Sequence, residues 1–85
     1  MSEVIVYSKA FCPYCDRAKQ LLTHKGVEYT EYRVDLNQAH FDEMLAKSEG
    51  RRTLPQIFIN DQGIGGFDEL LALEQQGKLD LLINS

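Results

Sequence analysis

Cys12 and Cys15 are the only cysteines in this 85-residue chain, and two residues separate them. They lie where an apolar, strand-like segment gives way to a segment with helical periodicity, so Cys12 is expected at the start of a helix. A thiolate at that position faces unpaired backbone N–H groups and the positive end of the helix dipole. We therefore predict redox chemistry, with Cys12 as the reactive sulfur.

Three other interpretations of the cysteine spacing are a zinc half-site, a structural disulfide and two inert small hydrophobic residues. Zinc needs four ligands, and His24 and His40 are too far apart in sequence to supply the usual second pair, so no metal is expected. A disulfide across so short a loop stabilises a fold by only about 2 kcal/mol in the chain-entropy model. Such a bond suits exchange chemistry better than a structural role.

The composition predicts a single domain spanning residues 1–85, with a hydrophobic content of 44% and one modest core. The first residues lack the basic and apolar stretches of a secretory signal, and no segment approaches the length of a membrane span. We therefore expect a cytoplasmic protein without a membrane partner, in a compartment where a Cys-x-x-Cys pair is usually catalytic or redox-sensing. The net charge of −4 and the dispersed lysines and arginines argue against a nucleic-acid partner.

Hydrophobic patterning predicts the elements that position the cysteines. The apolar run at 4–7 has no polar alternation, which indicates a central strand covered on both faces. A helix over about 13–25 follows, with Pro13 in its first turn and Gly26 after its end. Alternation over 29–35 predicts a half-exposed strand, parallel to the first and joined to it by a right-handed crossover.

A second helix and a hairpin are predicted next. Asn37 can cap the helix, with Leu36 and Phe41 forming a hydrophobic staple. The apolar run at 56–60 predicts a strand, and residues 61–63 have the composition of the turn that follows it.

The chain is predicted to end with a return strand and a last helix. The strand begins at Ile64, Asp68 is a candidate cap for the helix, and Gly77 ends it. The resulting fold class is α/β, with a mixed four-stranded sheet in the order β-α-β-α-β-β-α and helices on its faces.

Three motifs occur in order along this framework. They are Cys12-Pro13-Tyr14-Cys15 after the first strand, Thr53-Leu54-Pro55 before the third, and Gly65-Gly66-Phe67-Asp68 before the last helix. Together they resemble the small dithiol glutaredoxins over essentially the full length of the chain. The resemblance implies a thioredoxin-like fold and a glutathione-disulfide oxidoreductase, in which Cys12 is the nucleophile, Cys15 resolves and glutathione is the co-substrate.

The resemblance also implies a glutathione site and a cis bond before Pro55. Such a bond turns the Leu54 backbone toward an extended thiol peptide, which pairs with it as an added strand. Lys9 would stabilise the Cys12 thiolate. Either Arg51 or Arg52 would assist it; the sequence does not distinguish the two, and Arg52 stands among the predicted contacts with Arg51 as its alternative. The predicted glutathione contacts are Lys9, Tyr14, Arg52, Thr53, Leu54, Pro55, Gly66, Phe67 and Asp68.

Other residues near these motifs are assigned lesser roles. Phe67 stands where many glutaredoxins have a third cysteine, a difference that should not remove activity. Asp16 would oppose thiolate formation if it turned inward, so it is expected to face solvent near Arg17. His24 and His40 are interpreted as ordinary surface residues.

The predicted reaction is reduction of glutathionylated proteins, small mixed disulfides and protein disulfides. The expected partners are glutathione and disulfide-containing proteins, with ribonucleotide reductase as a candidate, and the protein is expected to be a monomer. One alternative is a thioredoxin-like donor recharged by a reductase. Another is an iron–sulfur cluster module, which Pro13 and the second cysteine make less favoured.

Overall fold

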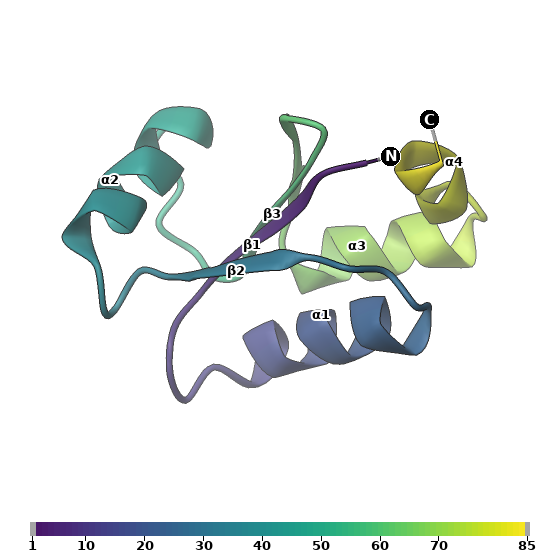
Figure 1. Ribbon diagram of the computed structural model, residues 1–85, viewed down its shortest axis with the longest axis horizontal. Helices are drawn as coiled ribbons and strands as arrows, with labels where there is room; N and C mark the ends of the chain where they lie inside the picture. Colours follow the sequence, from purple (N-terminus) through teal and green to yellow (C-terminus); the bar gives the residue numbers. More distant parts are fainter. Residues whose placement is uncertain (1, 85) are drawn as a thin grey trace.

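The computed structural model describes residues 2–84 and shows a four-stranded mixed sheet with helices on both faces (Figure 1). This arrangement confirms the predicted thioredoxin-like fold class. One short helix follows where the sequence suggested only a packed tail. The elements in chain order are β1 (Val4–Ser8), α1 (Pro13–His24), β2 (Thr30–Arg33), α2 (Gln38–Lys47), β3 (Gln56–Ile59), β4 (Gln62–Gly65), α3 (Phe67–Gln75) and α4 (Leu79–Ile83).

The strands lie in the order β2-β1-β3-β4. β1 pairs parallel with β2 and antiparallel with β3, and β3 pairs antiparallel with β4. All five residues of β1 are buried, which confirms the prediction of a central strand. Its side chains alternate between two cores, because Val4 and Val6 face one side of the sheet while Ile5 and Tyr7 face the other.

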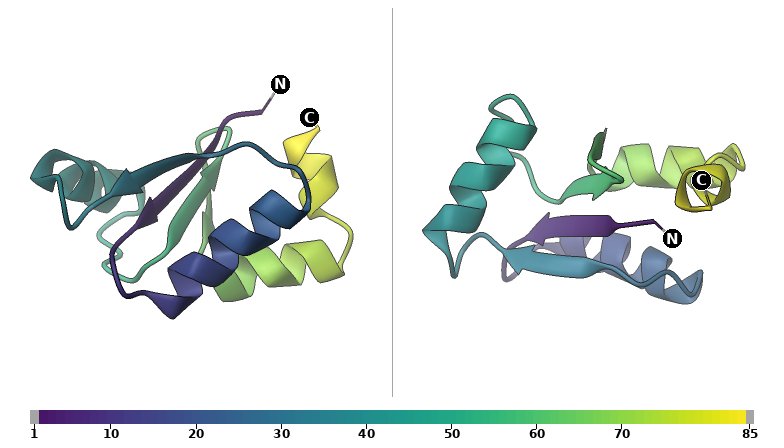
Figure 2. Two further views of the ribbon diagram at one scale, coloured as in Figure 1. Left: turned by 60° about the horizontal axis from the view of Figure 1, so that its bottom comes forward. Right: turned by 45° about the horizontal axis from the view of Figure 1, so that its top comes forward.

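The helices divide unequally between the two faces of the sheet (Figure 2). On one face, α1, α3 and α4 bury Leu22, Leu70 and Leu79 against the sheet. On the other face, α2 contributes Met44, which packs with Phe58 of β3. Because α1 and α3 share a face and contact each other, their N-terminal ends can contribute to one site. Within residues 2–84, no helix has the length and apolar character needed to cross a membrane.

The starts of the first two helices follow from their capping residues. Pro13 occupies the first helical position of α1, directly after Cys12, as the sequence predicts. The Asn37 side chain accepts a hydrogen bond from the Ala39 N–H at 2.9 Å, so its predicted role as the cap of α2 is confirmed. The staple is not supported, because Leu36 is 75% exposed.

The hairpin turn lies earlier than predicted. Asn60 and Asp61 are its central residues, with φ values of 52° and 65°, and β4 already begins at Gln62. A two-residue turn with both φ values positive has the twist that suits a hairpin, and asparagine and aspartate tolerate this conformation. The expectation of a turn at 61–63 was therefore wrong.

The cap of the last long helix lies two residues earlier than the sequence suggested. Gly66 is the cap of α3, and Asp68 lies within the first turn. The cap residue's own N–H is satisfied from inside the helix, since it donates to Glu69 Oε1 at 2.8 Å. The assignment of Asp68 as the cap is thus corrected.

Candidate active site

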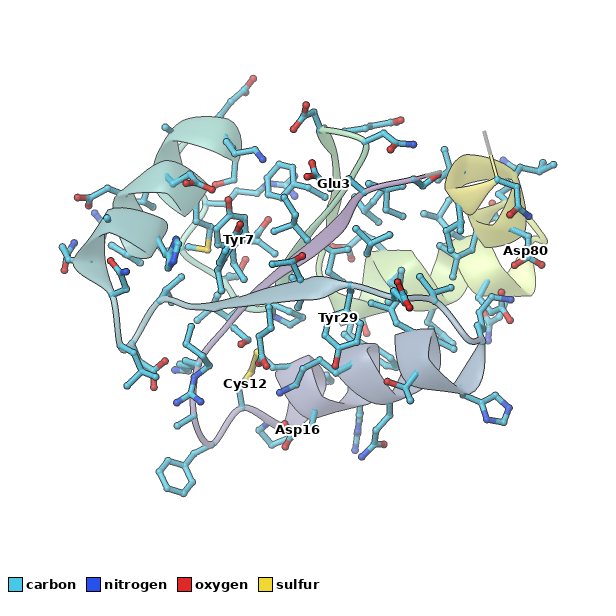
Figure 3. The ribbon with its side chains drawn as sticks, in the orientation of Figure 1. Glu3, Tyr7, Cys12, Asp16, Tyr29 and Asp80 are labelled. Carbon is cyan, nitrogen blue, oxygen red and sulfur yellow. A yellow bond between two sulfur atoms is a disulfide. The ribbon has the colours of Figure 1, made fainter. Side chains whose placement is uncertain are left out.

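The two cysteines form a disulfide at the start of α1, with 5.2 Å between their Cα atoms. Cys12 is the cap of the helix, and its sulfur accepts a hydrogen bond from the Cys15 N–H at 3.2 Å. Cys15 is fully buried, whereas Cys12 is 7% exposed. Figure 3 shows the Cys12 sulfur at the N-terminal end of the helix. The more accessible cysteine is therefore the one that caps the helix, as predicted from the spacing.

A cis peptide bond joins Leu54 to Pro55 directly before β3, as the resemblance implied. The Leu54 carbonyl oxygen lies 3.9 Å from the Cys12 sulfur, so this loop forms one side of the thiol site. The loop is held by Gln56, whose side-chain amide donates to both the carbonyl and the hydroxyl oxygen of Thr53 at 2.9 Å. Gln56 is only 3% exposed. Sequence reasoning placed it in the strand without assigning this role.

A cavity of about 230 Å³ opens beside this loop. Its walls come from the first turns of α1 and α3 and from the segment before β3. Seven predicted glutathione contacts line it together with one residue that was not predicted, Glu69. The lining residues are Tyr14, Thr53, Leu54, Pro55, Gly66, Phe67, Asp68 and Glu69.

Two aromatic residues, Tyr14 and Phe67, line the cavity. The ring centroids of Tyr14 and Phe67 lie 6.3 Å apart, with an interplanar angle of 32°. The Arg17 guanidinium lies 5.4 Å from the Tyr14 ring centroid. Because Tyr14 is still 52% exposed, its ring is available to a molecule in the cavity.

The backbone at the start of α3 completes the cavity. The first N–H groups of a helix have no intrahelical acceptor, and the helix dipole favours an anion there. At this terminus the Gly66 N–H already donates to the Glu69 carboxylate. The N–H groups of Phe67 and Asp68 come next in the first turn, beside the cavity that both residues line.

Two of the predicted contacts are not among the residues that line this cavity. Lys9 is exposed in the segment before Cys12. The Arg52 guanidinium lies 5.9 Å from the ring centroid of Phe41 on α2. The alternative arginine, Arg51, lines a separate cavity of about 250 Å³ with Lys47. Neither arginine is therefore placed at the thiol groove by this structure.

Asp16 faces solvent, as expected, with its side chain 63% exposed. Its ion-pair partner differs from the expected one. The carboxylate lies 3.7 Å from the Lys19 ammonium, whereas Arg17 lies over Tyr14. His40 also differs from a simple surface residue, because its ring stacks on Tyr32 with 4.2 Å between centroids.

A polar network holds the end of β1, from which the chain leads to the cysteines. The fully buried Ser8 hydroxyl donates to Glu31 Oε2 at 2.5 Å, and Lys19 of α1 donates to the same oxygen at 2.8 Å. Partial burial of Glu31 opposes its ionisation, but these two hydrogen bonds outweigh that effect and lower its pKa. The hydrogen bond to Glu31 likewise raises the pKa of Lys19.

A second carboxylate anchors the segment between β1 and Cys12. Asp35 accepts a hydrogen bond from the Ala10 N–H at 3.1 Å, and Arg33 donates to both of its oxygens at 2.7 and 2.8 Å. The Arg33 guanidinium holds the pKa of Asp35 well below its usual range, and the Ala10 N–H acts in the same direction. This contact ties the loop before Cys12 to the end of β2.

The arrangement is that of a thiol–disulfide oxidoreductase. A cysteine pair at a helix N-terminus faces a cis-proline loop on a mixed four-stranded sheet, and one cysteine is more accessible than the other. Comparison with known proteins agrees with this class. The family model described as glutaredoxin matches residues 4–64, and the chain belongs to the glutaredoxin family.

The similarity extends over nearly the whole chain. Glutaredoxin 3 of Escherichia coli strain K12 is 52% identical over 83 residues, covering 98% of this chain and 99% of its own. Glutaredoxin of Pseudomonas aeruginosa is 46% identical over 85 residues, with full coverage of both chains. Among solved structures, a buckwheat glutaredoxin–glutathione complex has a TM-score of 0.86 and 30% identity, covering 98% of this chain and 77% of that chain.

Proposed function

We propose that this protein is a glutathione-dependent oxidoreductase that reduces glutathionylated proteins, small mixed disulfides and protein disulfides. The observation that carries the proposal is the groove beside the reactive sulfur, where seven of the nine predicted glutathione contacts meet. The buckwheat relative is described as a glutaredoxin–glutathione complex, which supports the choice of ligand.

In the first step, the Cys12 thiolate attacks the glutathione sulfur of a mixed disulfide. A bond forms between the two sulfurs, the substrate sulfur leaves as a thiolate, and that thiolate takes a proton from water. The Cys12 thiolate is favoured by the helix N-terminus and by the Cys15 N–H, which already donates to this sulfur in the disulfide form.

Two routes then regenerate the enzyme. The thiolate of a second glutathione can attack the glutathione sulfur bound to Cys12, which yields oxidised glutathione and the Cys12 thiolate. Alternatively, Cys15 attacks Cys12, releases glutathione and forms the disulfide seen in the structure. Two further glutathione molecules then supply the two electrons that reduce this bond.

The groove suits the two ends of glutathione in different ways. The first-turn N–H groups of Phe67 and Asp68 can bind the glutamyl carboxylate, and the Asp68 carboxylate can pair with the ammonium group. The Leu54 backbone can pair with the extended peptide, while the Tyr14 ring covers its apolar side. Lys9 is long and exposed, so in this proposal it attracts the glycine carboxylate from the rim.

The decisive experiment compares two electron donors. Reduction of the cysteine–glutathione mixed disulfide is followed first with glutathione as the donor and then with thioredoxin reductase as the sole donor. The proposal expects turnover with glutathione and little with the reductase. The reverse result would establish the alternative, a thioredoxin-like electron donor.

Cysteine variants then test the assignment of roles. Cys12→Ser is expected to abolish every exchange reaction, whereas Cys15→Ser keeps deglutathionylation and loses much of the reduction of protein disulfides. Circular dichroism of both variants controls for folding. Equal losses in the two variants would contradict the division between nucleophile and resolving cysteine.

The proposal takes residues 1–85 as one glutaredoxin domain that acts as a monomer in the cytoplasm. A reducing compartment keeps the Cys12–Cys15 pair available for turnover. Ribonucleotide reductase remains a candidate recipient of electrons. Visible absorbance of the purified protein tests the cluster-binding alternative, since an iron–sulfur centre is coloured and a dithiol is not.

A further inference from the structure

The residue directly before the nucleophile has an unusual conformation. Phe11 has a φ of 55°, which lies in the left-handed region. Left-handed backbone is uncommon for residues other than glycine, and for a bulky residue it is a genuine outlier. Within residues 2–84, the other non-glycine residues with positive φ are Glu49, Asn60 and Asp61. Phe11 is thus the only aromatic residue among them.

The Phe11 side chain is also completely exposed, with a relative accessibility of 101%. Burying a phenylalanine ring is one of the larger favourable contributions that a single side chain can make to folding. Here the ring makes no such contribution, although the backbone adopts an unfavourable conformation at the same residue. The stability of the fold therefore does not account for this residue.

Both neighbours of Phe11 in the chain are held by hydrogen bonds. On one side, the Ala10 N–H is held by Asp35 at 3.1 Å. On the other side, Cys12 is fixed as the cap of α1. A residue anchored at both neighbours cannot easily turn its side chain into the core, so the ring stays in solvent next to the reactive sulfur.

The position of Phe11 limits what can contact it. Any protein whose disulfide reaches the Cys12 sulfur must bring the residues beside its own cysteine against the surface around Cys12. The exposed apolar side chains of that surface are Phe11, directly before Cys12, and Tyr14, two residues after it. Tyr14 lines the glutathione groove, whereas Phe11 is not among the residues lining that groove. Phe11 is therefore available to the part of the substrate that is not glutathione.

We propose that Phe11 is a docking residue for protein substrates and binds an apolar side chain that lies next to the disulfide-bonded cysteine of the substrate. The exchange step itself is unchanged. The Cys12 thiolate attacks one sulfur of the substrate disulfide, and the other sulfur leaves as a thiolate that takes a proton from water. Phe11 acts by holding the substrate segment, so it favours protein and peptide disulfides over small ones. This inference rests on thiol exchange at Cys12 and not on glutathione as the electron donor.

The test uses two peptides that differ only beside the cysteine. One has leucine on both sides of a glutathionylated cysteine, and the other has serine in both places. With the wild type, kcat/KM is expected to be about tenfold higher for the leucine peptide, which corresponds to about 1.4 kcal/mol. With Phe11→Gly this preference should fall below about twofold, because the ring is absent.

Phe11→Gly is the informative variant, because glycine adopts positive φ without strain and the loop keeps its course. Its thermal stability should equal or exceed that of the wild type. Phe11→Leu, which retains an apolar side chain, should keep most of the preference for the leucine peptide. Leu81→Ala serves as the matched control, because Leu81 is another apolar side chain with 71% exposure but lies on α4.

Several results would overturn the proposal. An unchanged preference in Phe11→Gly is one such result. Equal slowing of both peptides and of the cysteine–glutathione disulfide is another, since it would indicate a role in the site itself. A wild-type dimer that Phe11→Gly converts to a monomer would identify a second copy as the occupant. Repeating the comparison with dithiothreitol as the reductant separates this inference from the proposed function, since that donor does not need a glutathione site.

Discussion

Replacing Glu31 with alanine should destabilise the protein more than an ordinary surface substitution does. The Glu31 carboxylate accepts from the Ser8 hydroxyl at 2.5 Å and from Lys19 at 2.8 Å, so it joins β1, β2 and α1. A hydrogen bond to a charged group contributes about 1.5–3 kcal/mol. The partly exposed ion pair adds at most about 0.5 kcal/mol, after allowance for solvent screening.

The buried donor decides where in this range the effect falls. Ser8 has no exposed surface, so its hydroxyl cannot recover the lost bond from bulk water without a local opening. We expect Glu31→Ala to lower the free energy of unfolding by about 2–3 kcal/mol, which corresponds to a fall in Tm of about 8–24 °C for a domain of this size. Glu31→Gln keeps an acceptor for Ser8, so it should lower the free energy of unfolding by about half as much as Glu31→Ala does.

Urea unfolding of the wild type, Glu31→Ala, Ser8→Ala and the double variant measures this coupling. Because Ser8→Ala removes the donor as well, the double variant should be about 1 kcal/mol more stable than the sum of the single effects predicts. Effects that add within about 0.3–0.5 kcal/mol would show that the two residues act independently, and the reasoning from the buried hydroxyl would then fail.

The same network predicts a pH dependence with a definite sign. The pKa of Glu31 is lowered in the folded state, so its contribution is complete above the unfolded value of roughly 4.3 and is lost as the pH falls through the folded value. The pKa of Lys19 is raised, so its contribution is complete below roughly 10.4 and is lost as the pH rises through the folded value. Glu31→Ala should therefore lower the free energy of unfolding most between these limits, and its difference from the wild type should shrink in acid, where the protonated Glu31 carboxyl still accepts from Ser8 but no longer pairs with Lys19 as an anion.

Three further predictions concern the groove, the core and the loop before the thiol. Glu69→Ala should raise the apparent KM for glutathione severalfold. Glu69→Gln should raise it less, because the glutamine side chain still accepts a hydrogen bond from the Gly66 N–H at the cap of α3. Equal kinetics in the two variants would contradict this role of Glu69. Leu22→Ala should lower the free energy of unfolding by about 2–5 kcal/mol, whereas Leu81→Ala should change it by less than about 0.5 kcal/mol in urea unfolding. Asp35→Ala should speed hydrogen exchange at the Ala10 amide, and unchanged exchange there would refute the anchoring contact.

The sequence carried most of the information about the sheet and the thiol. The apolar run of β1 has no polar alternation, which is typical of a strand buried on both faces, and all five of its residues are buried. Pro13 and the helical spacing after it placed Cys12 at a helix start, because these are local features that do not depend on the rest of the chain. The cis bond before Pro55 came from the family resemblance and not from local physics.

The errors arose where tertiary contacts decide between similar local options. Gly63 was assigned to the turn because glycine is common in turns. In the structure it lies in β4 instead, where its lack of a side chain makes room for the Phe58 ring, which would lie 3.3 Å from an added Cβ. Arg52 has a long side chain that can reach several surfaces, and it lies over a ring of α2. The role of Glu69 was missed, although an acidic residue three positions after a glycine cap is a recognisable capping signal.

The groove depends on how two helices pack on one face of the sheet. Tyr14 lies in the first turn of α1 and Phe67 in the first turn of α3, and their rings approach to 6.3 Å because the two helices contact each other over a shared core. Leu22 and Leu70 belong to that core and are fully buried. A core substitution that shifts α1 along α3 would therefore change the width of the groove while leaving Cys12 at its own helix start. Glutathione affinity should be more sensitive to such packing than the reactivity of the thiol, since the first depends on two helices and the second on one.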